Sequence, residues 1–238
     1  MVIVQAPVNF ALIKYWGKRD DTLNLPSTSS LSISMKELYT ITQANFVSKE
    51  GNDEITINNK ALHHKESGKI LTHLQFLKNY FKKKGSFVIK SENNFPRNAG
   101  LASSASGFCA LTTACILAME EQWKSNDELS ILCRRGSGSS CRSLYGGFVL
   151  WDKGKSIDGN DSFAKQLFDQ NHWSDLHCMV ICISNQEKEI TSSTGMRQSK
   201  ETSAFYEHWV SSHENDLLKA IEYIKDKNFL SLAEIIEQ

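Results

Sequence analysis

A run of small and hydroxyl-bearing residues at positions 94–106 has the composition of a phosphate-binding loop. We expect a strand before it and a helix after it, and the first N–H groups of a helix lack partners within that helix. A small residue such as Gly100 lets a phosphate approach the backbone closely. The hydroxyl groups that could bind phosphate or Mg²⁺ are those of Ser103, Ser104 and Ser106. The run favours a phosphate site, and the alternative is a tightly packed helix start in which the serines only cap.

A second run, Arg134-Arg-Gly-Ser-Gly-Ser-Ser-Cys-Arg-Ser143, places glycines and serines between arginines. It is not a Walker A loop, because no Gly-Lys-Ser/Thr follows, and Cys141 stands where a Rossmann fingerprint has its third glycine. Serine hydroxyls beside three arginines suit an anion with several oxygens, and one arginine can bind a carboxylate through two hydrogen bonds. The alternative is a solvated linker. Because a linker rarely joins a strong helix to a strong strand, we favour a ligand-binding loop.

Two further segments carry weaker chemical signals. Residues 7–18 place Tyr15 between Lys14 and Lys18, which lie four positions apart. An ordinary half-buried segment with two solvated lysines has the same pattern, so the spacing alone leaves both interpretations open. Residues 189–197 form a hydroxyl-rich turn before an expected helix, which by itself indicates a helix start more than a binding site.

The overall composition excludes several classes of protein. The 238 residues include 27 Lys plus Arg and 27 Asp plus Glu, so no basic excess points to nucleic acid or to a membrane surface. No apolar run is long enough to span a bilayer, and the opening segment lacks the basic start of a signal peptide. Six cysteines without a Cys-x-x-Cys pair indicate reduced thiols in a cytoplasmic protein. Cys178 and Cys182 share the parity of one strand face and are expected in the core.

The elements that must position these loops mix strand and helix periodicity without a regular alternation of the two. Pro7 is expected to close the first strand. The polar, turn-rich stretch 152–175 indicates a domain boundary or a long surface connection. Strands are expected at 2–4, 31–35, 39–47, 54–58, 87–89 and 179–183. Helices are expected at 70–81, 104–121 and 126–135 and in three stretches after residue 183, the last of them at 229–236.

Taken together, several segments resemble the mevalonate diphosphate decarboxylases, a family within the superfamily of galactokinase, homoserine kinase, mevalonate kinase and phosphomevalonate kinase. The resemblance runs from residue 2 to the end of the chain, and residues 134–149 are similar to the family's substrate loop almost letter for letter. The matching segments are Pro7–Asp20, Leu25-Pro26, Ser29–Ser32, Asn93–Ala105, Arg134–Val149, Ser193–Met196 and Glu201–Ser203.

This resemblance implies an α+β fold of two domains, like that of the small-molecule kinases. The N-terminal domain, residues 1–175, would be ribosomal protein S5 domain 2-like and would bind the nucleotide and the substrate. Residues 176–238 would begin a ferredoxin-like C-terminal domain that is incomplete in this chain. The family also implies a homodimer.

The family catalyses the ATP-dependent decarboxylation of mevalonate 5-diphosphate to isopentenyl diphosphate in the mevalonate pathway, with ADP, phosphate and CO₂ as the other products. The resemblance therefore implies ATP and Mg²⁺ as cofactors. Catalytic roles fall to Arg142, which would bind the departing carboxylate, to Asn9, which would orient Arg142, and to Lys14. The substrate would be bound by Tyr15, Lys18, Ser137, Ser139 and Met196. The ATP phosphates would be bound by Gly100, Ala102, Ser103, Ser104 and Ser106, with Mg²⁺ at Ser104.

The sequence departs from the family pattern in two places. Arg97 and Asn98 replace residues that are often smaller in the family's ATP loop. The family's catalytic aspartate lies in a Phe-Asp-Ala-Gly-Pro-Asn-like segment, which this sequence lacks, so the chain looks like a family member shortened within its second domain. Two alternatives stay open: a relative that phosphorylates mevalonate or phosphomevalonate at the 3-position, and a shortened, non-catalytic protein that binds ATP or isoprenoid precursors.

Overall fold

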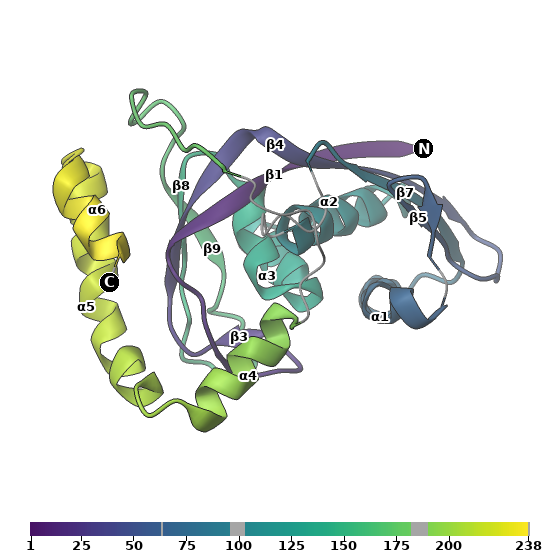
Figure 1. Ribbon diagram of the computed structural model, residues 1–238. Coiled ribbons are helices and arrows are strands. Elements are labelled where there is room, and N and C mark those ends of the chain that lie inside the picture. The colour runs from purple at the N-terminus through teal and green to yellow at the C-terminus, as the bar shows by residue number, and fades with distance from the viewer. Residues whose placement is uncertain (63, 96–102, 182–189, 238) are drawn as a thin grey trace.

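The computed structural model describes residues 1–62, 64–95, 103–181 and 190–237 (Figure 1). Within these ranges, a seven-stranded sheet consists of β1 (Val2–Ile13), β4 (Ser30–Val47), β5 (Glu54–Ile57), β6 (Lys60–Ala61), β7 (Ser86–Asn93), β8 (Phe148–Trp151) and β9 (Ala164–Phe168). A separate hairpin pairs β2 (Lys18–Asp20) with β3 (Leu25–Pro26). The helices are α1 (His64–Tyr80), α2 (Ser103–Ala118), α3 (Asn126–Gly136), a 3₁₀ helix (Gly138–Leu144), α4 (Ser192–Thr202), α5 (Tyr206–Lys225) and α6 (Phe229–Glu237).

The sheet is built around the long strand β4. β1 pairs antiparallel with one edge of β4, while β8 and β7 pair with the beginning and the end of its other edge. The expected strands 31–35 and 39–47 are therefore parts of one strand. The expected end of the first strand at Pro7 is also wrong, since β1 continues to Ile13. Its register shifts between Pro7 and Val8, and an edge strand tolerates a residue without an N–H donor.

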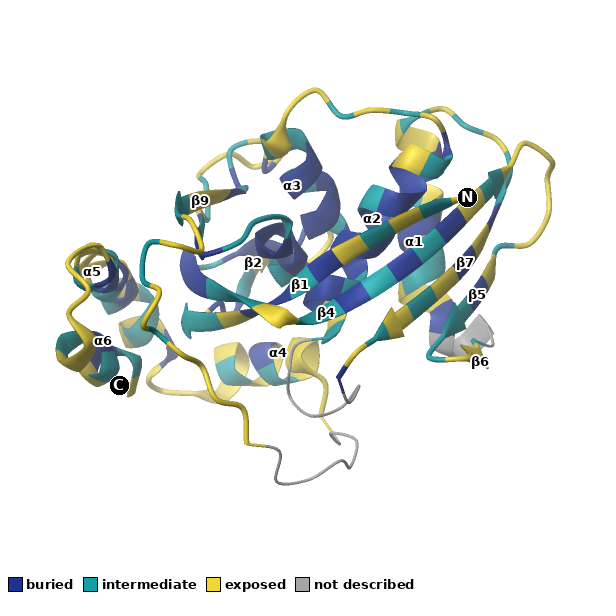
Figure 2. Ribbon diagram, turned by 90° about the horizontal axis from the view of Figure 1, so that it is seen from above, coloured by how far each residue is buried: buried dark blue, intermediate teal, exposed yellow. Residues whose placement is uncertain are grey.

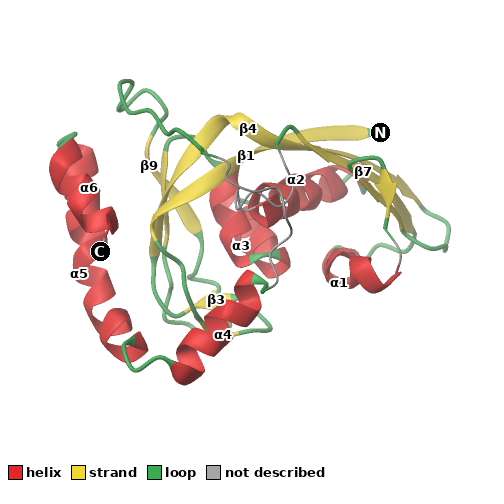
Figure 3. Ribbon diagram, viewed as in Figure 1, coloured by secondary structure: helices red, strands yellow, loops and turns green. Residues whose placement is uncertain are grey.

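Helices α1, α2 and α3 cover one face of the sheet (Figures 1 and 3). Along β1 and β4, buried residues are interspersed with more exposed ones, as Figure 2 shows. α2 is apolar on almost every side and packs on both strands. Large side chains of this core include those of Leu74, Leu77, Phe87, Ile89, Phe108, Leu111 and Leu132. Because α2 is held along its length, its first residue, Ser103, has a fixed position relative to the strands.

The C-terminal helices lie on another part of the sheet (Figure 1). A second apolar cluster joins α5 and α6 to β1, β4 and β8, and its members are Ile13, Leu31, Phe148, Leu217, Ala220, Ile224, Leu232 and Ile235. α4 lies close to the hairpin β2–β3, where Lys200 Nζ donates to the carbonyl of Lys18 at 3.1 Å. The three helical stretches expected after residue 183 are confirmed.

The polar stretch 152–175 contains a strand that its composition does not predict. β9 pairs antiparallel with β8 at the edge of the sheet. Its Lys165 and Gln166 are exposed, so the strand carries the polar residues typical of a solvated sheet edge. The boundary expected near residue 175 stays a prediction.

The strand expected at 179–183 is wrong over the residues that are described. Residues 179–181 belong to no strand, and Met179 is 86% exposed. No strand in the described ranges pairs with them, and an apolar segment without a hydrogen-bonding neighbour does not form a stable strand. Cys178 is exposed instead of lying in the core, and Cys182 lies outside the described residues. All cysteines in the described ranges are free thiols.

Candidate active site

A cavity of about 350 Å³ lies where β1, the segment 14–18, α1, α2, the 3₁₀ helix and α4 meet. It brings together residues from distant parts of the sequence. The predicted site residues among its lining are Asn9, Lys14, Tyr15, Lys18, Ser104, Ser137, Ser139, Arg142 and Met196. Their expected catalytic and binding roles stay predictions.

Positive charge dominates this cavity. Its cationic side chains are those of Lys14, Lys18, Lys69 and Arg142. In the described part of the chain, no aspartate or glutamate lines it. Asp21 Oδ1 lies 3.4 Å from Lys18 Nζ, but the Asp21 side chain is 75% exposed, and water screens such a pair. Burial and the nearby Lys18 lower the pKa of Lys69. The cavity therefore suits a ligand with several negative charges.

Arg142 is a buried cation whose hydrogen-bond partners are neutral. Its Nε and Nη2 donate to Asn9 Oδ1 at 3.2 and 3.0 Å, and its Nη1 donates to Ser30 Oγ. The guanidinium carbon lies 5.9 Å from the centre of the Trp151 ring. Burial lowers the pKa of Arg142, because the charged form loses its hydration. A buried guanidinium that has no carboxylate partner among the described residues is ready to receive an anion from a ligand.

Tyr15 presents a hydroxyl group without a partner in the described structure. Its Oη is buried and makes no hydrogen bond, and burial raises the pKa of the phenol, so the hydroxyl keeps its proton. The ring packs edge-on against Trp151, with centroids 4.7 Å apart. A Cβ atom at Gly138 would lie only 2.9 Å from Tyr15 Oη. Glycine at this position therefore leaves the room that the hydroxyl occupies.

The serines after α3 have two different roles. Ser137 and Ser139 line the cavity, whereas Ser140 Oγ lies 2.6 Å from the carbonyl oxygens of both Cys133 and Ser137, which share its one proton, and closes the turn. Cys141 is fully buried behind them, and burial raises its pKa to about 12. This segment is packed and hydrogen-bonded, which excludes the alternative of a solvated linker.

Only one of the three arginines in this run reaches the cavity. Arg134 is buried elsewhere, where it donates to the carbonyls of Leu23 at 3.2 Å and Gly159 at 2.8 Å, and also to that of Ser162. It therefore holds backbone segments together. Arg135 lies over the Phe76 ring at 4.6 Å. The expectation that all three arginines surround one anion is too broad, because α3 points two of them in other directions.

The N-terminus of α2 contributes Ser103 and Ser104 to cavities. Ser104 lines the cationic cavity and also a second, more apolar cavity of about 140 Å³, which Ser103 lines as well. Ser106 is fully buried instead, with its Oγ 2.7 Å from Thr40 Oγ1 in the core. Gly100 and Ala102 lie outside the described residues. The first turn of α2 thus stands at the junction of two cavities.

The second cavity is lined mainly by aliphatic and aromatic side chains. They are Ile55, Ile57, Ile70, Ile89, Phe108 and Leu111, from β5, α1, β7 and α2. Polar groups at its wall come from Ser91, Asn93, Ser103 and Ser104. Apolar walls with a few polar groups are typical of a pocket for a flat organic group.

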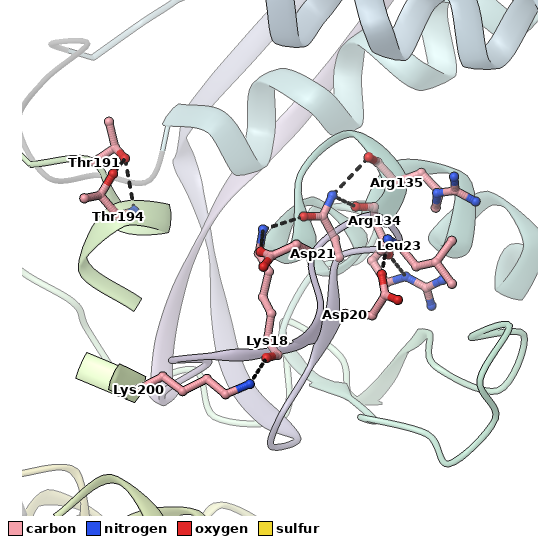
Figure 4. Close-up of polar contacts among 10 residues, drawn as sticks. Lys18, Asp20, Asp21, Leu23, Arg134, Arg135, Thr191, Thr194 and Lys200 are labelled. Atoms are coloured by element: carbon pink, nitrogen blue, oxygen red, sulfur yellow. Dashed lines mark hydrogen bonds and ion pairs between the residues drawn. The ribbon is translucent and has the colours of Figure 1, made fainter. Parts of the chain in front are cut away.

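The segment 14–18 is held in place by α4 and α5. Trp16 Nε1 donates to Ser199 Oγ at 2.9 Å, and Lys200 binds the carbonyl of Lys18 (Figure 4). Gly17 has a φ of +127°, and the Tyr206 hydroxyl lies so close that a Cβ atom at Gly17 would approach it to 1.9 Å. These contacts fix the backbone that carries Tyr15 and Lys18.

The hydroxyl-rich turn at 189–197 is a helix start that also lines the cavity. Thr191 caps α4, with Thr194 N donating to Thr191 Oγ1 at 3.2 Å (Figure 4). The next residues, Ser192 and Ser193, line the cationic cavity together with Met196. The sequence pattern predicts the helix start correctly but does not reveal these cavity contacts.

Four further residues were not predicted from the sequence: Ser30 and Ser143, which hold Arg142 and Asn9, and Asn24 and Lys69, which line the cavity. Ser30 lies within Ser29–Ser32, a segment that resembles the family, and this resemblance is the feature of the sequence that could identify it as a site residue. Lys69 lies on an amphipathic helix. The sequence around it does not show whether this lysine binds a ligand or is only solvated.

The described ranges contain neither the side-chain clusters that commonly hold metal ions nor the helices that span membranes. No group of three or more His, Cys, Asp or Glu side chains is arranged to hold a metal ion there. None of the helices in those ranges is both long enough and apolar enough to cross a bilayer.

Two family models match the chain. The first describes the diphosphomevalonate decarboxylase-like N-terminal domain and matches residues 6–164. The second describes the mevalonate 5-diphosphate decarboxylase C-terminal domain and matches residues 178–238. The diphosphomevalonate decarboxylase of Candida albicans is 38% identical over 98% of this chain and 67% of its own length. That of Saccharomyces cerevisiae is 38% identical over 97% of this chain and 61% of its own length.

Solved structures give the same result. Mevalonate diphosphate decarboxylase from Staphylococcus aureus matches with a TM-score of 0.89 and 37% identity, over 99% of this chain and 70% of the other. The complex of MDDEF with MVAPP, AMPPCP and magnesium matches with a TM-score of 0.88 and 38% identity, over 99% of this chain and 71% of the other. These matches confirm the α+β fold of the small-molecule kinase type. The chain, which spans 61 to 67% of the length of the two curated relatives, belongs to the mevalonate diphosphate decarboxylase family.

Proposed function

We propose that this chain binds mevalonate 5-diphosphate and ATP with Mg²⁺ for ATP-dependent decarboxylation to isopentenyl diphosphate. The observation that carries the proposal is Arg142, a buried cation with neutral partners in a cavity that three lysines also line. A substrate carboxylate would compensate this buried charge. The complex of MDDEF with MVAPP, AMPPCP and magnesium, a protein of the same fold, supports the assignment.

The cationic cavity divides into parts that suit the two ends of this substrate. Arg142 would bind the carboxylate at C1, held in position by Asn9 and Ser30. The diphosphate carries most of the negative charge, and it would be bound by Tyr15, Lys18, Ser137 and Ser139, which supply hydroxyl donors and an ammonium group. Apolar contacts with the methyl-bearing carbon would come from Val8, Met35 and Met196.

The nucleotide would span the junction at Ser104. The smaller, apolar cavity would receive the base, and the phosphates would lie at the N-terminus of α2, where the first N–H groups of the helix and the helix dipole favour negative charge. Ser103 and Ser104 would add hydroxyl groups there. Since Ser106 points into the core, we propose for it a structural role in place of the expected contact with phosphate.

The residues at this junction fit a magnesium ion that arrives with the nucleotide. Mg²⁺ is usually bound by one or two protein oxygens together with substrate phosphates and water, so the Ser104 hydroxyl suffices as the ligand from the described residues. ATP would supply the phosphoryl group for the tertiary 3-hydroxyl, and Mg²⁺ would neutralise charge on its phosphates. Lys14, which lines the same cavity, would place a positive charge near the reacting oxygens. Arg142 would keep the carboxylate oriented while the cavity excludes water from it.

Calorimetric titration of the 238-residue chain tests the proposal, with mevalonate 5-diphosphate and the Mg²⁺ complex of a non-hydrolysable ATP analogue as separate ligands. We expect both to bind, and mevalonate 5-diphosphate to bind at least about tenfold more tightly than mevalonate 5-phosphate, because the second phosphate meets further cationic and hydroxyl groups. A coupled assay for ADP and CO₂ then separates turnover from binding. Absence of binding by mevalonate 5-diphosphate would overturn the proposal, and a preference for the monophosphate would favour the 3-kinase relative.

We also propose that the protein is a cytoplasmic homodimer. The basis is its membership of a family of biosynthetic enzymes, together with its free cysteines. Sedimentation equilibrium over a range of concentrations would test the dimer, and a monomer mass at all of them would reject it. Fractionation of the source cells would test the location.

A further inference from the structure

Asn24 links Lys18, which lines the cationic cavity, to the C-terminal end of α3. It is the last residue of the turn between β2 and β3, has a φ of +52°, and is only 7% exposed. Lys18 Nζ donates to Asn24 Oδ1 at 2.8 Å. Asn24 Nδ2 donates to the carbonyls of Arg134 at 3.1 Å and Arg135 at 3.0 Å.

These contacts determine which way the Asn24 amide faces. Both N–H bonds of the amide nitrogen are used by carbonyls at the C-terminal end of α3, so the amide oxygen must face Lys18. Reversing the amide would place its oxygen against two carbonyl oxygens and its N–H groups against an ammonium. The amide therefore holds Lys18 at a fixed position relative to Ser137, which directly follows α3.

The type of residue at position 24 also matters for charge. Asn24 is neutral, so it restrains the ammonium of Lys18 without cancelling its positive charge. Among the described residues, the Lys18 ammonium has a second partner, Asp21, which lies farther away, at 3.4 Å, and is mostly exposed. A buried carboxylate at position 24 would form a close ion pair with Lys18 and would compete with an incoming anion. The amide provides a contact that leaves the charge available.

We propose that Asn24 is a positioning residue, which acts through Lys18 to set the affinity of the cavity for the diphosphate group. This inference rests on the proposed function, since the diphosphate is the anion that Lys18 would bind there. Asn24 itself would not react with the substrate. Its contribution would be to keep Lys18 oriented before the ligand arrives, which reduces the ordering cost of binding.

Two substitutions test this role while keeping the backbone. Asn24→Gly removes the amide but allows the positive φ. The hairpin keeps other ties, because Arg134 Nε donates to the carbonyl of Leu23 and Leu23 N donates to Asp20 Oδ1 (Figure 4). Asn24→Asp is nearly isosteric and also tolerates a positive φ, but one of its carboxylate oxygens replaces the amide N–H groups beside the carbonyls of Arg134 and Arg135. Thermal unfolding would establish that each variant is folded at the temperature of titration.

In calorimetric titrations we expect Asn24→Gly to weaken the binding of mevalonate 5-diphosphate about tenfold and Asn24→Asp to weaken it further, about 30-fold or more. The affinity for the Mg²⁺–nucleotide analogue should change less than twofold. In a Lys18→Met background, Asn24→Gly should have less than a twofold effect, because the group through which Asn24 acts is gone. A purely structural role would instead give the same loss in both backgrounds.

The outcomes separate this inference from the proposed function. If the wild-type chain does not bind mevalonate 5-diphosphate, the proposed function fails. If the wild-type chain binds it and Asn24→Gly binds equally well, or if the effects of Asn24→Gly and Lys18→Met simply add, the positioning role of Asn24 is overturned. If Asn24→Gly does not fold, Asn24→Asp decides: undiminished affinity for the diphosphate rejects the inference.

Discussion

The amide oxygen of Asn9 accepts hydrogen bonds from two nitrogens of Arg142, at 3.0 and 3.2 Å. The amide nitrogen of Asn9 donates to the carbonyl of Ser139 at 3.1 Å and to Ser143 Oγ at 2.7 Å, so the amide has one orientation. Arg142 is thereby held by neutral groups and keeps a buried positive charge. An arrangement of this kind costs desolvation energy in the free protein and favours the binding of an anion.

Arg142→Met is predicted to weaken the binding of mevalonate 5-diphosphate at least about 100-fold, because it removes the buried charge and keeps most of the side-chain volume. Nucleotide affinity should stay unchanged. Arg134→Met is the matched control, since Arg134 is a buried arginine of the same run that binds backbone carbonyls. It should lower the free energy of unfolding by about 2–4 kcal/mol, because those carbonyls lose their donors. Calorimetry and urea unfolding measure the two effects, and equal substrate affinity in both variants would contradict the assignment.

Ser104→Ala and Ser106→Ala are predicted to have opposite profiles. Ser104 lines both cavities, so its alanine variant should bind the Mg²⁺–nucleotide analogue about fivefold or more weakly with unchanged stability. Ser106 contacts Thr40 in the core, so its alanine variant should lose about 1 kcal/mol of stability and keep its nucleotide affinity. Titration and thermal unfolding of both proteins test this. If only the Ser106→Ala variant bound the nucleotide more weakly, Ser106 and not Ser104 would be the serine that contacts the phosphates.

This contrast illustrates what the sequence can predict. The hydroxyl-rich composition locates the loops, because a phosphate site needs small residues and donors close together in the chain. Composition does not separate Ser104 from Ser106, or Ser139 from Ser140, because the direction of each side chain depends on how α2 and the 3₁₀ helix pack. For the same reason it does not reveal that Arg142, among three arginines, is the one that reaches the cationic cavity.

The fold has similar limits of prediction. The apolar helix α2 and the helices after residue 190 follow from the local sequence. A strand, however, needs a partner that can lie far away in the sequence. Residues 179–181 have an apolar pattern but no partner in the described ranges, whereas β9 lies in a polar, turn-rich stretch and pairs with β8. Sequence periodicity therefore predicts helices here more reliably than sheet edges.

We expect His73 to lower the free energy of unfolding at acidic pH, because its imidazole binds a proton more readily in the unfolded chain. Thr112 Oγ1 donates to the carbonyl of Phe108 at 2.6 Å, so it accepts the hydrogen bond from His73 Nε2 at 2.7 Å, and the imidazole is neutral. Burial, together with the charges of Lys69 and Arg135, lowers the pKa of His73 to about 3. An unfolded chain binds this proton near pH 6.5. The contribution of His73 is thus fully present above pH 6.5 and is lost as the pH falls toward 3.

The measurement is urea unfolding of the wild-type protein and of His73→Gln at several values from pH 7 to pH 4. Below about pH 6, the wild-type free energy of unfolding should fall faster than that of the variant, by up to about 1.4 kcal/mol per pH unit. Other titrating groups are common to both proteins and cancel in the comparison. Parallel curves for the two proteins would show that His73 does not titrate on unfolding in this range.

Gly17→Ala is predicted to disturb both stability and substrate binding. The alanine Cβ would approach Tyr206 Oη to 1.9 Å, and the φ of +127° is unfavourable for any residue with a side chain. Relief of the clash requires the buried Tyr206 side chain or the segment 14–18 to move, and movement of the segment displaces Tyr15 and Lys18. We expect a loss of at least about 2 kcal/mol in the free energy of unfolding and weaker binding of mevalonate 5-diphosphate.

Tyr206→Phe separates the clash from the backbone strain at Gly17. By itself it removes the hydrogen bond from Tyr206 Oη to Ser27 Oγ, at 3.2 Å, and should cost about 1 kcal/mol. Combined with Gly17→Ala, it removes the atom nearest to the new methyl group, so the double variant should be more stable than the sum of the single effects predicts. Part of the loss should remain, because the unfavourable φ persists and the ring carbon Cζ would still lie 2.9 Å from the new Cβ. Strictly additive effects in a double-mutant cycle would mean that the Tyr206 hydroxyl does not limit the size of residue 17.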